Sequence, residues 1–512
     1  MHRHFSLHER SSGVLLHLSS LPGLFGVGDL GPEAYAFVDF LAQARQRWWQ
    51  MLPVSPEGPG DSPYHSTSAF AGNPLFISAE GLADAGLIDR KDAEHGRKAP
   101  SEGRADFGHA HAAKAKILKK AFSRFSSDGG SRRHDLDAFC HASADWIEEF
   151  ALFSALKRWH RGASWGSWDP DVRKRKPEAL EAARKSLAKE IEYEKFLQFE
   201  FDRQWKALRA HAAEKGVGFI GDVPIYVSHD SADVWSRQEL FFLDDEGRST
   251  VVAGVPPDYF SKTGQLWGNP LYRWGVHHEQ NYAWWLARLK KAFERFDVAR
   301  LDHFIGFSRY WEIPGGSETA VGGRWVPGPG EEFFRHAMTA LPGGQLIAED
   351  LGVVTDEVVR LRDTFGFPGM RVLQFGFGSD GTNIHLPHNF TANSVVYTGT
   401  HDNDTATGWF FGEEAPAEAK RHEAYKRERA FALAYMNSDG WEVHWDLIRL
   451  ASSSIAKTAI FPAQDLLGLG DATRMNRPGK TEGNWLWRLG PGALTTAIAG
   501  RLGDLTSTYG RG

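Results

Sequence analysis

The sequence predicts an α/β fold of the (β/α)8 TIM-barrel class, with inserted, largely helical subdomains and no C-terminal β-sandwich. Short apolar runs rich in β-forming residues alternate with longer amphipathic segments, a pattern typical of βα units and a parallel sheet. Eight such runs occur, and eight strands close a barrel. Only residues 463–512 follow the eighth run, too few for an appended sandwich of about 100 residues. An open, doubly wound sheet is the alternative architecture.

The eight runs are spread unevenly along the chain. They cover residues 13–18, 48–52, 218–227, 298–304, 345–350, 370–377, 394–400 and 458–462. The gap after the second run is far longer than one crossover requires. Within it, apolar residues recur at helical spacing among Glu and Lys at Leu180, Ala183, Leu187 and Ile191. We therefore expect a barrel formed by residues 1–79 and 195–512, and an inserted helical subdomain over residues 80–194.

The composition of the 512 residues excludes several classes of protein. The net charge of −6 is mild and basic clusters do not recur, so we expect no nucleic-acid partner. The one cysteine, Cys140, cannot form an intramolecular disulfide or a Cys-rich metal site, and it suits a reducing compartment. No apolar run reaches the ~18 residues of a membrane helix, and the first residues lack the apolar core of a signal peptide. We expect a cytoplasmic protein without a membrane partner.

A glycine-rich motif follows the first run. Residues 26–31, Gly-Val-Gly-Asp-Leu-Gly, match the GxGxxG pattern of dinucleotide-binding turns. Seven residues, 19–25, separate the motif from the run before it, whereas a dinucleotide-binding turn is tight, and no acidic residue ends the next run. We interpret the motif as a loop between a strand and a helix, and we expect no cofactor.

Acidic residues end four of the runs, in segments 221–226, 299–304, 347–352 and 397–404. The carboxyl ends of barrel strands form the face that carries barrel active sites, so these acids should converge there. A single acid at a strand end is usually a helix cap or an ion-pair partner. Several together, beside Arg300, His303 and His401, indicate a catalytic site.

Strand alternation selects among these acids. Arg300 and Asp302 are two residues apart and share a face. The arginine favours the ionised form of Asp302, which a nucleophile or an electrostatic stabiliser needs. Glu349 and Asp350 point to opposite faces, so only one of them should face a substrate. We choose Glu349 and interpret Asp350 as structural.

Paired carboxylates and many aromatic side chains together suit chemistry at a sugar. The chain has 19 Trp, 12 Tyr and 34 Phe, and aromatic faces stack on sugar rings while two carboxylates act at the anomeric carbon. Trp267 lies in a polar, glycine-rich segment, 264–270, which we interpret as a loop, so it is a candidate for stacking. No HExxH or similar spacing indicates a metal, and no GxSxG indicates a serine nucleophile.

With these motifs the chain resembles the amylomaltases or 4-α-glucanotransferases, the disproportionating enzymes of glycoside hydrolase family 77, from Arg10 to about Trp487. The resemblance is carried by segments 15–17, 21–23, 28–31, 60–64, 68–74, 254–260, 265–270, 300–304, 348–352, 386–389, 400–403 and 474–476. It implies transfer of α-1,4-glucan segments to the 4-hydroxyl of an acceptor glucan or glucose by α-retaining double displacement. The implied partners are α-1,4-glucans and malto-oligosaccharides, with no metal and no obligate protein partner.

The resemblance also implies roles for individual residues. Asp302 resembles the nucleophile that forms a covalent glycosyl-enzyme, Glu349 the general acid and base, and Asp402 the carboxylate that holds the 2- and 3-hydroxyls of the reacting sugar. The positions implied to bind substrate are Arg300, His401, Tyr64, Asp258, Gln265, Trp267 and Asn476. In this mechanism the carboxyl groups of Asp302 and Glu349 should lie about 5–5.5 Å apart once substrate is bound.

Two positions depart from the family pattern. His65 stands where Gln is common and Ile305 where Arg is frequent, which puts the chain-length preference in doubt. Two other functions stay open: an α-amylase-type glucan hydrolase, which would give the same intermediate to water, and a non-catalytic glucan-binding protein. The missing C-terminal sandwich favours the transferase over the hydrolase, and the three intact carboxylates argue against a protein that only binds.

Overall fold

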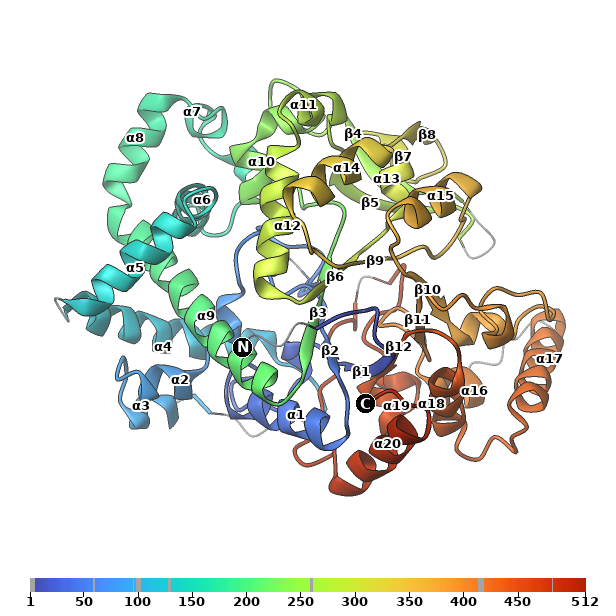
Figure 1. The fold of residues 1–512 in the computed structure, drawn as a ribbon. Coiled ribbons are helices and arrows are strands. Elements are labelled where there is room, and N and C mark those ends of the chain that lie inside the picture. The colour runs from blue at the N-terminus through green and yellow to red at the C-terminus, as the bar shows by residue number, and fades with distance from the viewer. Residues whose placement is uncertain are drawn as a thin grey trace.

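The computed structural model describes residues 5–58, 60–94, 96–97, 103–127, 130–257, 261–412, 419–480 and 482–512, without the side chains of residues 131 and 419–422. Eight parallel strands close into a barrel in the order β1-β12-β11-β10-β9-β6-β3-β2 (Figure 1). They are β1 (Ser11–Leu15), β2 (Trp48–Gln50), β3 (Gly218–Val223), β6 (Val298–Leu301), β9 (Leu346–Ala348), β10 (Gly369–Val372), β11 (Ser394–Tyr397) and β12 (Thr458–Pro462). The predicted barrel is confirmed, and the open sheet is wrong.

Each barrel strand overlaps one of the eight predicted runs, and most strands are shorter than the run. Strands β6 and β9 end at Leu301 and Ala348, directly before the acidic residues that close their runs. Strand β1 lies so close to β2 that only glycine fits at Gly13. A side chain there would approach the backbone oxygen of Trp48 to 2.4 Å. Across the interior, the Tyr397 hydroxyl donates to Gln50 Oε1 at 3.0 Å.

The long gap between β2 and β3 is helical, as predicted. It holds α2 (Ala79–Asp84), α3 (Arg90–Glu94), α4 (Phe107–Ser127), α5 (Ser131–Ala142), α6 (Ile147–Trp159), α7 (Pro170–Arg173), α8 (Pro177–Ser186) and α9 (Ala188–Glu214). The apolar stripe crosses a break at Leu187, which caps both α8 and α9, and its four members are buried. The predicted boundary of the subdomain, at residues 194 and 195, lies inside α9 and coincides with no end of a helix. The division into a barrel and a separate subdomain stays a prediction.

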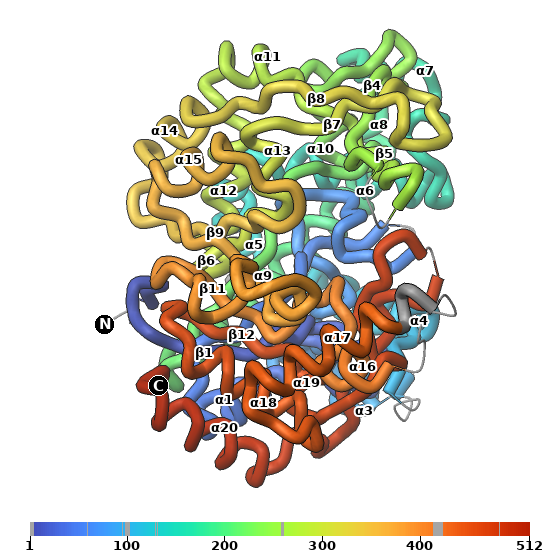
Figure 2. Tube along the Cα trace, turned by 90° about the vertical axis from the view of Figure 1, so that its right-hand side faces the viewer, coloured from blue at the N-terminus to red at the C-terminus, as the bar shows by residue number. Residues whose placement is uncertain are grey.

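A second, antiparallel sheet of four strands in the order β5-β4-β7-β8 lies outside the barrel. Its strands are β4 (Val251–Val255), β5 (Gln265–Pro270), β7 (Arg309–Pro314) and β8 (Arg324–Pro327). The interpretation of segment 264–270 as a loop is therefore wrong, because Trp267 lies within β5. Figure 2 shows β4, β7 and β8 at one end of the molecule and α20 at the other.

The remaining helices surround the barrel. They are α1 (Pro32–Gln43), α10 (Ala232–Ser236), α11 (Trp274–Glu279), α12 (Ala283–Arg295), α13 (Ile305–Ser308), α14 (Gly330–Ala340), α15 (Asp356–Thr364), α16 (Ala406–Phe411), α17 (Ala419–Met436), α18 (Val443–Ser453), α19 (Ala463–Leu466) and α20 (Thr496–Thr508). The first and last of them, α1 and α20, pack side by side (Figures 1 and 2). After β12 the described residues form helices and loops but no further strand, as the fold prediction requires.

Buried apolar side chains form two large clusters. One joins barrel residues such as Trp48 and Phe461 to α1, α4 and α9, and the other joins Phe304 and Trp285 to α6, α10 and α14. The helices of the long insertion therefore share their cores with the barrel. None of the helices in the described part of the chain is long and apolar enough to cross a membrane.

Candidate active site

The strand-end acids meet at the mouth of the barrel. Asp222 lies in β3, and Asp302, Glu349 and Asp402 follow β6, β9 and β11 respectively. Because these strands are parallel, their carboxyl ends face the same way. Asp222 and Arg300 are register partners across β3 and β6, and the backbone N–H of Glu349 donates to the Leu301 carbonyl at 3.1 Å. Pairing between neighbouring strands thus brings Asp302 and Glu349 to the same level of the barrel.

Arg300 holds two of the acids. Its Nη1 donates to both carboxylate oxygens of Asp222 at 2.8 Å and to Asp302 Oδ1 at 3.0 Å. The side chains of Arg300 and Asp222 are 4% and 1% exposed, whereas that of Asp302 is 27% exposed. Burial opposes the charge of Arg300, but the carboxylates around it, led by Asp222, raise its pKa well above its ordinary value. Arg300 is a permanent cation beside an accessible Asp302.

Tyr64 and His401 form a stacked pair beside Asp222. The Tyr64 hydroxyl donates to Asp222 Oδ2 at 2.7 Å and lies 2.9 Å from His401 Nε2. The two rings stack with centroids 5.2 Å apart. Burial raises the pKa of the Tyr64 hydroxyl well above its ordinary value, so the group stays a neutral donor.

Asp402 lies next to His401 and is held by polar neighbours. Asn476 Nδ2 donates to Asp402 Oδ1 at 2.6 Å, and His401 Nε2 lies 3.3 Å from Asp402 Oδ2. The backbone N–H of Asn476 donates to the His401 carbonyl at 3.1 Å, which ties the Asn476 segment to the strand end. The side chain of Asp402 is 45% exposed, so it is open to a ligand.

Glu349 is buried and has a different kind of partner. Its Oε2 accepts the backbone N–H of His303 at 2.6 Å, and its Oε1 accepts that of Leu351 at 3.1 Å. His303 has a φ of +50°, an uncommon left-handed conformation for a residue with a side chain, in the turn that directs this N–H. Burial raises the pKa of Glu349 to about 8, reinforced by Asp302 and opposed by Arg300. Glu349 is therefore an acid that can keep its proton near neutral pH.

Asp350 faces away from this site. Its Oδ2 accepts from Arg362 Nη1 at 2.5 Å, and its Oδ1 accepts the backbone N–H of Met370 at 2.7 Å. A side chain at Gly369 would come within 2.4 Å of the Asp350 carboxylate, so the glycine makes room for it. This placement supports the interpretation of Asp350 as structural.

Two further predicted substrate-binding residues lie in β5. The Trp267 indole N–H donates to Gln265 Oε1 at 3.1 Å, and the Trp267 ring meets that of His303 edge-on with centroids 4.8 Å apart. Trp267 thus lies next to the turn that follows Asp302. The remaining predicted residue, Asp258, lies outside the described residues.

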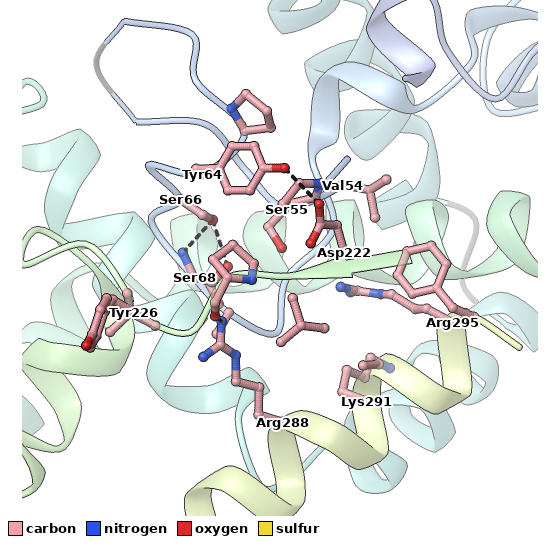
Figure 3. A pocket seen from close by; sticks show the side chains of 18 residues that line it. Val54, Ser55, Tyr64, Ser66, Ser68, Asp222, Tyr226, Arg288, Lys291 and Arg295 are labelled. Atoms are coloured by element: carbon pink, nitrogen blue, oxygen red, sulfur yellow. Dashed lines mark hydrogen bonds between the residues drawn. The ribbon is translucent and has the colours of Figure 1, made fainter. Parts of the chain in front are cut away.

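A cavity of about 50 Å³ lies behind this network. Figure 3 shows the Tyr64 hydroxyl directed at Asp222, with Arg288, Lys291 and Arg295 extending from α12 on the opposite side. A space of this size holds a few water molecules and no sugar ring. We assign it to the support of Asp222 and not to substrate.

Sequence reasoning gave no individual role to three residues that surround the site. Asp222 was recognised as a strand-end acid, but its pairing with Arg300 depends on strand register. Trp485 places its ring 5.7 Å from that of Tyr64 and 6.0 Å from that of His401, and Arg474 Nη2 donates to the Asp402 carbonyl at 2.9 Å. Arg474 adjoins the Asn476 position, which was a usable signal, whereas nothing near Trp485 set it apart from the other tryptophans.

The two departures from the family pattern differ in their surroundings. His65 is exposed, and its backbone carbonyl accepts the N–H of Gly58 at 2.5 Å. Ile305 is buried at the start of α13, inside the second apolar cluster. Among the described residues, no group of three or more His, Cys, Asp or Glu side chains could hold a metal ion.

The chain is similar to known proteins over nearly its whole length. A family model described as 4-alpha-glucanotransferase, of glycoside hydrolase family 77, matches residues 16–494. The 4-alpha-glucanotransferase of Synechocystis sp. is 47% identical over 511 residues, 99% of each chain. That of Thermus thermophilus is 48% identical over 502 residues, 96% of this chain and 97% of its own.

Two solved structures of amylomaltases are also similar to this chain. An amylomaltase from Streptococcus agalactiae, determined in complex with acarbose, has a TM-score of 0.93 and 38% identity, covering 98% of this chain and 100% of that one. An amylomaltase from Corynebacterium glutamicum has a TM-score of 0.80 at 18% identity, covering 98% of this chain and 75% of that one, and so shares the fold.

Proposed function

The chain belongs to the 4-alpha-glucanotransferases of glycoside hydrolase family 77, and we propose that it works by α-retaining double displacement, with Asp302 as nucleophile and Glu349 as general acid and base. One observation carries this proposal. The two carboxyl groups follow neighbouring strands at one barrel mouth, one facing a guanidinium and the other buried with a raised pKa. Such a division is what a nucleophile and a proton donor require.

In the first step, an oxygen of Asp302 attacks the anomeric carbon of an α-1,4 linkage. Arg300 contacts Oδ1, which leaves Oδ2 to form the new bond. As the bond from the anomeric carbon to the leaving 4-oxygen breaks, Glu349 gives that oxygen a proton, and the rest of the donor glucan departs. The products are a glycosyl ester on Asp302 and an ionised Glu349.

In the second step, the 4-hydroxyl of an acceptor glucan attacks the same carbon. Glu349 takes the hydroxyl proton as the new carbon–oxygen bond forms, and the bond to Asp302 breaks. Glu349 is again protonated and Asp302 again ionised, so both carboxyl groups return to their starting states. Two inversions at one carbon leave the α configuration unchanged.

The other residues hold the sugars in this scheme. Asp402, kept in place by Asn476 and His401, accepts hydrogen bonds from the 2- and 3-hydroxyls of the reacting sugar. Tyr64 stacks on His401 and fixes its ring. Gln265 and Trp267 of β5, together with Asp258, bind the neighbouring sugars, and Trp267 offers an indole face for stacking.

We propose α-1,4-glucans and malto-oligosaccharides as the substrates. The Streptococcus agalactiae amylomaltase was solved with acarbose bound, which supports an oligosaccharide in the corresponding cleft of this chain. The single cysteine suits a reducing compartment, and a cytoplasmic location stays a prediction.

Incubation with maltotriose tests the function. A transferase redistributes maltotriose to glucose and longer chains while the total of reducing ends stays constant. A steady rise in reducing ends would show that water is the main acceptor, as in a glucan hydrolase. Unchanged chain lengths would show binding without catalysis and would overturn the proposal.

A further inference from the structure

A second cavity, of about 280 Å³, lies outside the ring of barrel strands. It is lined by the start of α6, by α10, by the first turns of α12 and by the segment 68–70. Figure 1 shows α6, α10 and α12 on the same side of the barrel. This volume is near the lower end of the range of about 300–1,000 Å³ that small-molecule sites occupy.

Aromatic side chains form one wall of this cavity. Trp146, Trp284 and Phe70 line it together. Phe70 stacks on Trp146 with centroids 6.2 Å apart and meets Trp284 edge-on at 5.9 Å. Phe70 and Trp146 are buried and hold the wall in place, whereas Trp284 is half-buried and provides its accessible part. Rings fixed against one another offer apolar area without a large loss of side-chain freedom on binding.

Polar groups of mixed character complete the lining. Asp145, Arg237 and Gln280 are exposed at its rim. Asp233 is buried and accepts the backbone N–H of Ala69 at 2.8 Å. The lining carboxylate of Glu149 is already paired with Arg175 Nη2 at 2.7 Å. Donors and acceptors of both signs over an aromatic wall suit a neutral ligand rich in hydroxyl groups, because neither sign of charge dominates.

We propose that this cavity is a second binding site for α-1,4-glucan, separate from the site at Asp302 and Glu349. The choice of ligand rests on the proposed function, in which the substrate is a polymer of glucose. The sugar ring would lie against Trp284, with its hydroxyl groups bonded to Gln280 and Asp145 at the rim.

The second cavity and the small cavity that supports Asp222 flank one segment of chain. Ser68 lines both this cavity and the one beside Tyr64 and Asp222 (Figure 3). Asp233 fixes the backbone of Ala69 between them. A long glucan held in the second cavity keeps its other residues near the active site, so the effective concentration of its chain there rises. A trisaccharide is too short to gain in this way.

Filling the cavity tests the proposal. Ala283 is an exposed residue at the start of α12, and Ala283→Trp places an indole in the space. The matched control is Ala497→Trp, at an exposed alanine in the first turn of α20. We expect the ratio of kcat/KM for amylose to kcat/KM for maltotriose to fall about fivefold in Ala283→Trp and to stay at the wild-type value in the control.

Binding is measured independently of turnover. In the full-length Asp302→Asn protein, calorimetry with maltoheptaose should show one more binding site than in the same protein carrying Ala283→Trp. An equal number of sites in the two proteins, or an equal fall of both kcat/KM values in Ala283→Trp, would overturn the proposal. If Ala283→Trp lowers the melting temperature, Gln280→Ala replaces it, with an expected fall of about twofold in the same ratio.

The two hypotheses fail in different ways. If the wild-type protein leaves maltotriose unchanged, the proposed function fails, whereas the number of maltoheptaose sites still decides whether the second cavity binds glucan.

Discussion

The carboxyl groups of Asp302 and Glu349 lie at the mouth of one barrel, after neighbouring strands, and differ in their surroundings. Asp302 is about a quarter exposed and faces the Arg300 guanidinium, whereas Glu349 is buried and accepts two backbone N–H groups. Burial raises the pKa of Glu349 to about 8. The comparison teaches that strand position brings two like groups together, while their immediate neighbours make them different. In the proposed mechanism that difference decides which group attacks and which carries the proton.

The largest effect is expected from Asp302→Asn, which removes the negative charge beside Arg300. Asp302→Asn has nearly the same shape, but it cannot form the glycosyl ester, so turnover of maltotriose should fall at least about 10⁴-fold. Binding of maltoheptaose, measured by calorimetry, should survive. Substantial remaining transfer would rule out Asp302 as the nucleophile.

The next largest effect is expected from a change of the buried Glu349. Glu349→Gln keeps an acceptor oxygen for one of the two backbone N–H groups but cannot give or take a proton, so kcat should fall about 10³-fold.

The matched control for Glu349→Gln is Asp350→Asn, in the adjacent residue. It removes the charge partner of Arg362 and should cost about 3–5 kcal/mol of stability. The folded fraction should keep its turnover, because Asp350 does not face the site. A loss of turnover equal to that of Glu349→Gln, without a lower melting temperature, would contradict the different roles of the two acids.

A smaller effect should follow from changing what holds Arg300. Asp222→Asn weakens the pairing that fixes the guanidinium beside Asp302, and displacement of the guanidinium should lower kcat about 100-fold. Tyr64→Phe removes one hydrogen bond to the same carboxylate and should cost about 1 kcal/mol, roughly fivefold. If the two variants have equal activity, Asp222 does not act through Arg300.

The last prediction concerns the pH profile of the unmodified protein. Glu349 must be protonated for the first step, and its proton is lost as the pH rises through about 8. The kcat/KM for maltotriose should therefore be near its maximum at about pH 7, about half of that at pH 8 and about tenfold lower at pH 9. In Glu349→Gln this alkaline limb should be absent. A fall in kcat/KM beginning near pH 5, as for an ordinary glutamate, would show that burial does not raise the pKa of this group.

The fold was predictable because each barrel strand is an apolar run of its own. Runs such as 48–52 and 458–462 are mostly apolar, which is typical of strands buried on both faces, and the structure confirms them. The strand that contains Trp267 was not predictable in this way. Its residues alternate between partly buried positions and the exposed Leu266 and Gly268, so it contains no continuous apolar run. It forms a strand because β4 pairs with it.

The candidate site was predictable to the extent that its residues lie at strand ends. Asp302, Glu349 and Asp402 lie together as their strand positions required, and their catalytic roles stay a prediction. The turn at His303 was not predictable, since its left-handed backbone is imposed by the fold and not by a glycine. The same holds for Trp485, which reaches Tyr64 from a distant part of the chain.

The sequence by itself determined the number and order of the barrel strands, and which kinds of acid stand at their ends, because both follow from the spacing of neighbouring residues. The tertiary structure alone decided the partner of each acid: Arg300 for Asp222, Arg362 for Asp350, and two backbone N–H groups for Glu349. The reason is physical. A charge is set by burial and by groups within a few ångströms, and partners such as Arg300 and the N–H of His303 lie tens of residues away from their acids along the chain.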